Sequence, residues 1–350
     1  MKIAIGSNIK NSPFGGGNQF ATNLRANLAQ QGHQVFDHLN PHDIDVILMT
    51  EPRKWLQSCA FGPIQIALYQ RNVNPNAIVV HRVNECDERK NTRTVNAQLA
   101  LANSVADHTV YVGSWLVDLF AERNFTKSFN VIVSGADRKI FPFSQKHLPT
   151  AGEKIRLVTH HWSAHWMKGW DIYTDLDKRL GVNSPFEFHY IGNRPKDIET
   201  KNIIFHKPCH GDVLARKLAK NHIYLTGSMN EPGPMHPVEG MSVGLPVIFR
   251  DSGALPEYCS EYGISFHDMA TLWNALTEMR QNYIRYSESM AGFSQNAVLM
   301  TKQYLDLFKM LINKKETVYG ARQRHNSLVH CAKFATNYYR YYILNRVGFQ

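Results

Sequence analysis

The sequence has little cysteine, with five residues in 350, and the five are far apart along the chain. None of them forms a Cys-x-x-Cys pair, and an odd number of thiols cannot pair completely. A disulfide framework or a cysteine-based zinc site is therefore not expected, and we interpret the cysteines as reduced, structural thiols. They are Cys59, Cys86, Cys209, Cys259 and Cys331.

Long hydrophobic runs are also missing. No stretch reaches the roughly 18 uninterrupted apolar residues that a membrane-spanning helix needs. The first residues have the basic start of a signal peptide, but their apolar run is only four residues long and ends at Ser7 and Asn8. We interpret this segment as a first strand, and with no export signal we expect a cytoplasmic location.

Acidic residues are scarce at the end of the chain. Between Lys314 and Gln350, seven lysines or arginines accompany one acid, Glu316, so this segment carries +6 (seven minus one) of the net charge of +10. Such a mixture of basic and aromatic residues suits an anionic membrane surface, here the inner face of the membrane, or equally a solvated helix packed on the protein. Nucleic acid is the weaker alternative, and we expect no such partner. The aromatic residues are Tyr338, Tyr339, Tyr341, Tyr342 and Phe349.

What the chain does have is a regular alternation of short apolar runs with amphipathic stretches, which predicts an α/β fold with parallel sheets covered on both faces. Residues 141–154, rich in proline, glycine and polar residues, interrupt the alternation and are typical of a linker. We therefore predict two similar domains, residues 1–145 and 146–310, and a basic aromatic helical tail, residues 311–350. The tail either packs back on the first domain or lies on a membrane surface. The predicted strands are 2–5, 45–49, 77–81, 108–112 and 130–133, then 155–159, 186–191, 203–205, 223–225, 246–249 and 264–266.

Three consecutive glycines, Gly15 to Gly17, follow the first predicted strand and open the first predicted helix. Glycine lets the backbone approach a ligand closely, and the start of a helix offers unpaired N–H groups to an anion or a sugar hydroxyl. The pattern is neither G-x-G-x-x-G nor a P-loop, so a nicotinamide or P-loop site is not expected. A plain tight turn is the alternative interpretation.

The strongest pattern lies in residues 228–257, where Glu231 and Glu239 are separated by seven positions. The Pro-Gly-Pro between them prevents a helix from beginning before about Met235, so Glu231 lies on a loop and Glu239 about one turn into the next helix. Carboxylates accept hydrogen bonds from sugar hydroxyls, and the amides at a helix N-terminus suit a diphosphate. Residues 244–248 then end the helix and begin a strand, and residues 251–257 form another glycine turn.

This segment resembles the E-x7-E donor-site signature of family 4 of the glycosyltransferases, a family of retaining enzymes. Gly240 stands where the family usually has alanine in Glu-Ala-Met, which is a mild departure. Weaker similarities follow in the family's order over about residues 2–310 of this chain. They are the glycine loop, the strand 77–81 ending at His81, residues 110–114, residues 134–141, and Lys168-Gly169.

The resemblance implies the GT-B fold, in which two Rossmann-like domains with parallel sheets face each other across a cleft. It implies a hexosyltransferase that takes the sugar of a nucleotide sugar with retention. The sequence does not name the nucleotide, and UDP-, GDP- and ADP-sugars are the candidates. The basic tail favours a glycan or lipid-linked acceptor in polysaccharide, lipopolysaccharide or glycoconjugate synthesis. The nucleotide sugar is a co-substrate, and neither a cofactor nor a metal is expected.

Carried over to this chain, the resemblance implies catalytic roles for three residues. His81 would contact the sugar near its anomeric centre, Lys168 would neutralise the diphosphate, and Glu231 would hold the sugar hydroxyls. The other donor-binding positions would contact phosphate through backbone amides, complete the loop after Glu231 and bind the ribose. They are Gly16, Gly17, Gly233, Met235 and Glu239.

One departure concerns charge. The family usually has an arginine a few residues before the lysine, and residues 159–166 contain none. His161 or His165 could substitute, or Arg194 could reach in; a strand-end histidine satisfied by local contacts is the other interpretation of His161.

Other patterns have structural interpretations. His160, His161 and His165 lack the matching spacing of a zinc site. The Asp-x-Asp patterns at 43–45 and 175–177 are interpreted as surface acids, and the charged segment 82–89 either binds an acceptor or forms local ion pairs. A nucleotide-sugar epimerase, a sugar phosphorylase, or a non-catalytic binder of sugar nucleotides or polyanions remain alternative functions.

Overall fold

The computed structural model describes residues 1–350 except 13, 124, 126–127, 151, 322–327 and 347–350, and without the side chains of 321–333 and 345–350. The contacts of the chain divide it into two compact units. The first unit contains residues 1–9, 17–133 and 300–350, and the second contains residues 10–16 and 134–299.

The first unit is built on a six-stranded sheet in the order β2-β1-β3-β4-β5-β6, with every neighbouring pair parallel. Its strands are β1 (Lys2–Ile5), β2 (Gln34–Phe36), β3 (Val46–Met49), β4 (Ile78–Val83), β5 (His108–Tyr111) and β6 (Phe129–Val131). The helices associated with it are α1 (Gly16–Gln30), α2 (Pro63–Asn72), α3 (Val95–Asn103), α4 (Trp115–Phe120), α11 (Ala297–Asn313), α12 (Lys315–Ala321) and α13 (Leu328–Arg346).

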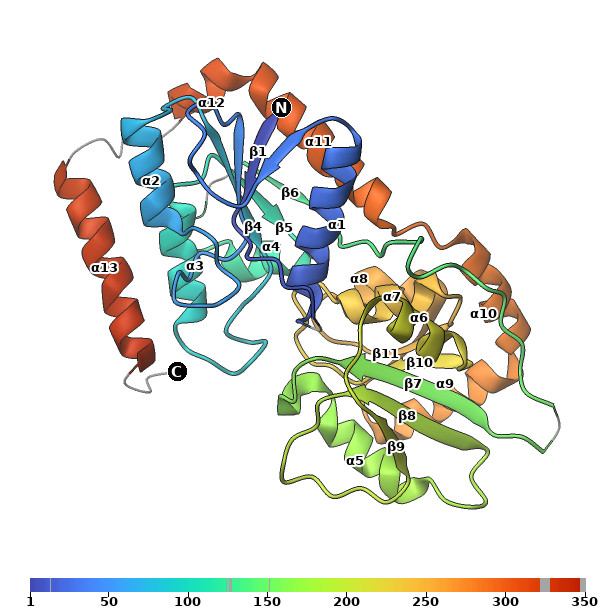
Figure 1. Ribbon diagram of the computed structural model, residues 1–350. Coiled ribbons are helices and arrows are strands. Elements are labelled where there is room, and N and C mark those ends of the chain that lie inside the picture. The colour runs from blue at the N-terminus through green and yellow to red at the C-terminus, as the bar shows by residue number, and fades with distance from the viewer. Residues whose placement is uncertain (13, 124, 126–127, 151, 322–327, 347–350) are drawn as a thin grey trace. The chain divides into compact units, whose positions relative to one another are not determined.

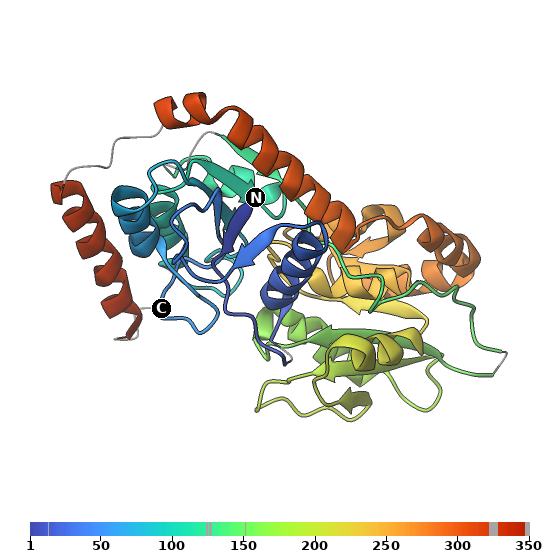
Figure 2. The ribbon, with the colours of Figure 1, turned by 45° about the horizontal axis from the view of Figure 1, so that its top comes forward.

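Helices cover both faces of this sheet, with α1 and α11 on one face and α2 and α3 on the other (Figures 1 and 2). The apolar stripe of α1 is buried, as its spacing predicts, and Phe20 packs against Tyr304 of α11 with ring centroids 5.5 Å apart. All four residues of β3 are buried because this central strand is covered on both sides.

The second unit repeats this plan with the strand order β12-β11-β10-β7-β8-β9, again with every neighbouring pair parallel. Its strands are β7 (Ile155–His161), β8 (Phe186–Gly192), β9 (Ile203–His206), β10 (Ile223–Thr226), β11 (Val247–Arg250) and β12 (Gly263–Phe266). Its helices are α5 (Trp170–Arg179), α6 (Gly211–Ala219), α7 (Met235–Ser242), α8 (Leu255–Cys259), α9 (Met269–Gln281) and α10 (Tyr283–Ser289), with 3-10 turns η1 (Trp166–Lys168), η2 (Ser260–Tyr262) and η3 (Met290–Gly292).

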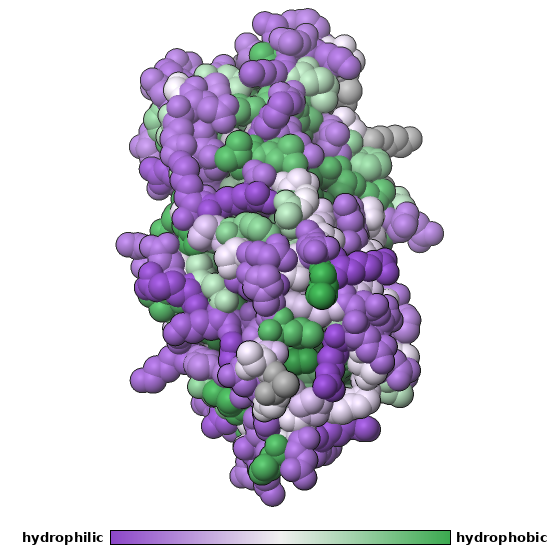
Figure 3. Space-filling view, turned by 90° about the vertical axis from the view of Figure 1, so that its right-hand side faces the viewer, coloured by the Kyte–Doolittle hydropathy of each residue, from purple (hydrophilic) through white to green (hydrophobic). Residues whose placement is uncertain are grey.

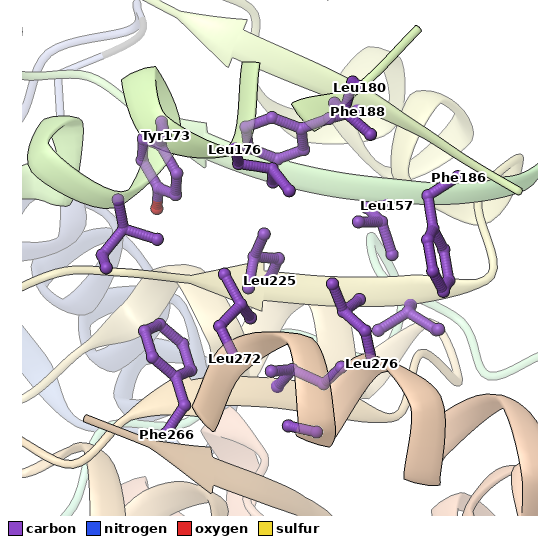
Figure 4. Close-up of a cluster of buried hydrophobic side chains, with 14 of the residues drawn as sticks. Leu157, Tyr173, Leu176, Leu180, Phe186, Phe188, Leu225, Phe266, Leu272 and Leu276 are labelled. Atoms are coloured by element: carbon purple, nitrogen blue, oxygen red, sulfur yellow. The ribbon is translucent and has the colours of Figure 1, made fainter. Parts of the chain in front are cut away.

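The core of the second unit lies between its sheet and the pair α5 and α9. Leu157 of β7 and Leu225 of β10 meet Leu176 of α5 and Leu276 of α9 in one buried cluster (Figure 4). Each of these four side chains is fully buried, and full burial of a leucine stabilises a fold by about 1.5–3 kcal/mol. This packing fixes the ends of β7 and β10, from which the candidate site is built.

The α/β class with parallel sheets is confirmed, since each predicted strand overlaps an observed one. The structure adds the short edge strand β2, the helices α8 and α10, and the long helix α11, none of which the sequence pattern had indicated.

The division of the chain differs from the predicted domains. It falls between Val133 and Ser134 instead of at residue 145, and residues 300–310 belong to the first unit. The predicted linker, 141–154, belongs to the second unit because its first half is held by hydrogen bonds. Ser242 of α7 donates to the Phe141 carbonyl oxygen at 2.8 Å, and Ser287 of α10 donates to the Lys146 carbonyl oxygen at 2.5 Å.

The described part of the tail packs on the first unit, where α13 contacts α2 and α3. The Tyr338 hydroxyl is the main anchor: it donates to the Pro52 carbonyl oxygen at 2.6 Å and accepts from the Lys54 N–H at 2.8 Å. The Tyr338 and Tyr342 rings both contact Trp55. Tyr339, Arg340 and Ile343 remain exposed on the outer face of the helix.

Among the described helices, none is long and apolar enough to cross a membrane. On the face shown in Figure 3, hydrophobic residues lie in small separate groups among hydrophilic ones.

Candidate functional site

Three loops meet at the carboxyl ends of β7, β10 and β11 in the second unit, and glycines allow their close approach. Gly169, at φ +102°, follows η1, and a Cβ on it would lie 2.6 Å from the Gly227 carbonyl carbon at the end of β10. Gly253, at φ +59°, lies in the loop after β11, and a Cβ there would lie 2.6 Å from the Glu231 nitrogen. Only glycine fits both positions, because a side chain would collide with backbone atoms.

Lys168 and Glu231 form a buried ion pair at this meeting point. The Lys168 Nζ lies 2.8 Å from Glu231 Oε1, and both side chains are almost completely buried. Lys168 ends η1 after β7, and Glu231 lies on the loop after β10. Two residues predicted as catalytic from separate motifs are therefore brought into contact.

The loop that carries Glu231 is held from both sides. Asn230 has φ +50°, an uncommon conformation for a residue other than glycine, and its N–H donates to Ser252 Oγ at 2.9 Å. The carbonyl oxygen of Glu231 accepts from the Ala254 N–H at 2.9 Å, and the Met229 N–H donates to the Met167 carbonyl oxygen at 2.9 Å. The direction of the Glu231 side chain is thus set by backbone contacts to the neighbouring loops.

Glu239 lies in α7, which begins at Met235 as the Pro-Gly-Pro pattern predicts. Its Oε2 is 2.7 Å from His160 Nε2, and His160 Nδ1 is 3.0 Å from the Tyr224 hydroxyl. That hydroxyl also accepts from the His160 N–H at 3.2 Å, so its proton is available to Nδ1. With a proton on Nε2, His160 donates to the Glu239 carboxylate and so links Glu239 to Tyr224.

His161, the next residue, points into a different group of side chains. Its Nε2 lies 3.2 Å from Thr159 Oγ1 and 3.3 Å from the Tyr173 hydroxyl, and its ring centroid is 4.6 Å from that of His236. Burial raises the pKa of Tyr173 to about 12, so its hydroxyl stays protonated at neutral pH. His165, the other predicted substitute for arginine, accepts from the Met167 N–H at 3.2 Å and shapes η1.

The glycine loop divides between the two units. Gly16 belongs to the second unit, where a Cβ on it would lie 3.0 Å from Met235 Cβ, so these two predicted donor-binding residues are neighbours. Gly15 approaches the exposed ring of Trp162. Gly233 lies on the bend before α7. Gly17 belongs to the first unit, where a Cβ on it would lie 3.7 Å from the Asn84 amide.

Arg194 is exposed after β8 and stacks on β9, with its guanidinium carbon 4.8 Å from the centre of the Phe205 ring. This contact does not bring it to the Lys168–Glu231 pair. A cation that sequence reasoning missed is Arg250 at the end of β11, which donates to Asp171 Oδ2 at 2.8 Å.

His81 does not end its strand, as the predicted range 77–81 had it. It lies in the middle of β4 in the first unit, and its side chain is fully buried. Its Nδ1 is 3.0 Å from the Asn103 amide nitrogen, and its ring stacks on Phe125. Burial lowers the pKa of His81 to about 3, so the ring is neutral. Strand β4 continues for two residues beyond His81, and the contact with a sugar stays a prediction.

The other patterns have structural partners. Asp43 pairs with Lys2 at 2.6 Å, and Asp177 accepts N–H bonds from three residues, 201–203. In the segment 82–89, Glu85 pairs with Lys90 at 2.7 Å, and Asp87 accepts from the Val95 and Asn96 N–H groups at the start of α3. Among the residues that the structure describes, no group of three or more His, Cys, Asp or Glu side chains is placed to hold a metal ion.

Comparisons with known proteins identify the fold. No protein-family model matches the sequence, and no curated protein matches it. A sucrose-phosphate synthase from Thermosynechococcus elongatus is 15% identical with a TM-score of 0.66, over 89% of this chain and 99% of that one. Anabaena HepE, in complex with UDP and glucose, is 14% identical with a TM-score of 0.65, over 89% of this chain and 100% of that one.

WaaG, a glycosyltransferase involved in lipopolysaccharide biosynthesis, is 12% identical with a TM-score of 0.60, over 88% of this chain and 99% of that one. At such low identities the likeness concerns the fold. The chain has a GT-B glycosyltransferase fold, and that part of the prediction is confirmed.

Proposed function

We propose that the chain is a retaining, metal-independent glycosyltransferase that moves a hexosyl unit from a nucleotide sugar to an acceptor hydroxyl. The observation that carries this proposal is the buried contact between Lys168 and Glu231, next to the N-terminus of α7 that bears Glu239. Ligands of such sheets bind beyond the carboxyl ends of the strands, where these residues lie.

The chemistry requires charge at a defined place. The bond between the anomeric carbon and the diphosphate oxygen breaks, its electron pair leaves with the diphosphate, and a new bond forms to the acceptor oxygen, whose proton is released. Lys168 and the amides that begin α7 would oppose the negative charge on the leaving group. Glu231 would release Lys168 to the diphosphate and accept hydrogen bonds from sugar hydroxyls. Glu239 would lose its contact with His160 and accept hydrogen bonds from the ribose instead.

A uridine nucleotide is the first donor to test, because solved complexes of HepE contain UDP or UDP-glucose. GDP- and ADP-sugars belong in the same screen. A donor present at 100 times its dissociation constant raises the free energy of unfolding by about 2.7 kcal/mol, which a thermal-shift measurement detects. If no nucleotide sugar raises the melting temperature, the proposal fails.

The decisive variants remove the charges of the ion pair one at a time and together. Losing one group that stabilises a leaving group typically lowers the rate by about 10²–10³-fold, so Lys168→Met and Glu231→Gln should each abolish most of the transfer. Each also leaves a buried charge without its partner, which costs about 3–5 kcal/mol of stability. The double variant should regain stability and still lack activity.

Lys302→Met is the matched control, because Lys302 forms an exposed ion pair with Asp306 in α11. It should change neither stability nor rate. Donor turnover is measured as nucleoside diphosphate release with glycan or lipid-linked acceptors, or with water. Full activity in a folded Glu231→Gln protein contradicts the proposal. The anomeric configuration of the product tests retention, and unchanged activity in excess EDTA tests metal independence.

The same assays separate the alternatives. An epimerase would isomerise the donor without an acceptor, and a phosphorylase would need inorganic phosphate. A donor that binds without yielding any product would indicate a non-catalytic binder.

For the acceptor, we propose a glycan or lipid-linked glycan used at the inner face of a membrane. What supports this is the exposed face of α13, with Tyr339, Arg340 and Ile343, and the absence of any acid from residue 317 to the end of the sequence. Aromatic and aliphatic side chains can enter the headgroup region while cations attract anionic lipids.

The membrane surface is tested by sedimentation with vesicles. Wild-type protein should sediment with phosphatidylglycerol vesicles and not with phosphatidylcholine vesicles. The double variant Tyr339→Ser/Ile343→Ser should bind more weakly, whereas Ile284→Ser, at an exposed site in the second unit, should not. Equal binding by both variants contradicts this surface, and salt-sensitive binding to RNA would favour a polyanion.

A further inference from the structure

The histidine cluster, defined as His160, His161 and His236, lies at the candidate donor site, and the proposed mechanism assigns no charge to its rings. His160 and His161 end β7, and His236 is the second residue of α7. The His236 ring centroid lies 4.6 Å from that of His161 and 6.3 Å from that of His160, and all three side chains are buried. His236 is thus the ring that the other two approach, and imidazoles can take up protons but carry no permanent charge.

Three permanent cations near this site each have a partner in the empty protein. Lys168 pairs with Glu231, Arg250 pairs with Asp171, and Arg194 stacks on Phe205. A nucleotide sugar brings two negative charges on its diphosphate. Residues 159–166, which contain two of the three histidines of the cluster, have no lysine or arginine. Lys168, which the proposed mechanism moves to the diphosphate, supplies a single positive charge against these two negative charges.

The surroundings of the cluster are polar but mostly uncharged. Tyr173 of α5 and Thr159 face His161, and the Tyr190 ring of β8 lies 5.9 Å from it. Thr226 of β10 faces His236 with its Oγ1 2.9 Å from Nε2, and the Tyr224 ring lies 6.2 Å away. Burial raises the pKa of each of the three tyrosines, so their hydroxyls remain neutral.

The two carboxylates of the candidate site each have a partner in the empty protein. Glu239 accepts from His160 at 2.7 Å, and Glu231 pairs with Lys168. His236 lies in the first turn of α7, where the diphosphate would dock, and His161 is the ring nearest to it, so we assign the new charge to these two members of the cluster.

We propose that the donor's diphosphate draws a proton from solvent onto His161 or His236, which then serves as a counter-charge to the diphosphate. The inference rests on the proposed glycosyltransferase function. The cluster is buried at the start of α7, and both burial and the positive end of a helix disfavour a protonated imidazole. A bound diphosphate reverses that balance, so donor binding and proton uptake favour each other.

If donor binding takes up one proton, the donor binds up to about tenfold more tightly for each unit by which the pH falls. This slope holds over the pH range in which the rings of the free protein are neutral. We therefore expect the dissociation constant of the donor to be about tenfold higher at pH 7.5 than at pH 6. The probe is UDP-glucose, or the GDP- or ADP-glucose that binds best in the thermal-shift screen. A sugar nucleotide is required because the terminal phosphate of a free nucleoside diphosphate itself titrates near pH 6.

Titration calorimetry in two buffers with different ionisation enthalpies counts the protons taken up. Wild-type protein should take up between about half a proton and one proton per donor at pH 7. His161→Gln and His236→Gln keep a polar atom near the Nε2 position but cannot become cations. At least one of these variants should bind the donor more weakly than the wild type at pH 6. Its dissociation constant should change less than about twofold between pH 6 and pH 7.5.

His189→Gln is the matched control, since His189 stacks on His206 in β9, away from the cluster, and the variant should keep the wild-type pH dependence. A wild-type affinity that does not change with pH overturns the inference while leaving the proposed function intact. A pH dependence that persists in both cluster variants and disappears in His160→Gln overturns the assignment to His161 and His236. Failure of every nucleotide sugar to bind is instead a failure of the proposed function.

Discussion

At the scale of single residues, Gly253 decides where the Glu231 carboxylate lies. Its φ of +59° disfavours any side chain, and a Cβ would collide with the Glu231 backbone at 2.6 Å. Gly211 has nearly the same φ, +58°, with no atom within 4 Å of its would-be Cβ. Comparing substitutions at the two glycines therefore separates the cost of the backbone conformation from the cost of a steric collision with the Glu231 backbone.

We expect Gly211→Ala to lower the free energy of unfolding by about 1–2 kcal/mol, the cost of a left-handed conformation. Gly253→Ala should cost about 1–3 kcal/mol more because of overpacking, and it alone should weaken donor binding by displacing Glu231. Urea unfolding and donor titration measure the two effects. Equal losses of stability and unchanged donor binding in both variants would show that Gly253 does not position the loop.

The residues of the candidate site were predictable where the sequence itself carries the constraint. Lys168 and Glu231 each follow an apolar run and adjoin glycine or proline, so both could be assigned to loops at strand ends. The partners His160 and His236 could not be derived, because their contacts join positions far apart in the sequence. The burial of His81 was equally hidden, since it depends on how far β4 extends beside β5.

At the scale of elements, apolar runs predicted the central strands well, because strands such as β3 are buried on both faces and read as continuous hydrophobic segments. The edge strand β2 has three residues, none of them fully buried, so it left no such signal. Residues 141–154 resemble a linker in composition because they contain proline, glycine and polar residues. Their attachment by Ser242 and Ser287 is a tertiary contact that composition cannot reveal.

The C-terminal helix α13 is an element whose docking depends on one hydroxyl. Tyr338→Phe would leave the Pro52 carbonyl oxygen and the Lys54 N–H without this partner, which costs about 1–3 kcal/mol. We expect α13 to detach more easily, so limited proteolysis should remove the tail faster in this variant.

Tyr339→Phe is the control for that experiment, because Tyr339 is on the same helix and 55% exposed. Its proteolysis rate should match that of the wild type. If Tyr338→Phe is also cut at the wild-type rate, the helix is held by ring packing against Trp55 and not by the hydroxyl.

At the scale of the whole molecule, buried histidines make the fold sensitive to acid. Burial lowers the pKa of His81 to about 3 and that of His222 to about 4, one in each unit, and it also lowers the pKa of His108. In an unfolded chain the same rings titrate near 6.5, so the unfolded state binds more protons over the range between the folded and unfolded values.

Stability must therefore fall as the pH drops below about 6.5, by up to about 1.4 kcal/mol per pH unit for each such histidine. We expect the urea midpoint to decrease from pH 6.5 to pH 5, and the free energy of unfolding of His81→Gln to depend less steeply on pH by about that amount. His38→Gln, at an exposed ring, should keep the wild-type slope. Proton uptake by the buried His81 ring requires the surrounding core to open. If His81→Gln keeps the wild-type slope, protons reach this ring without unfolding, and β4 is more accessible to ligands than its burial indicates.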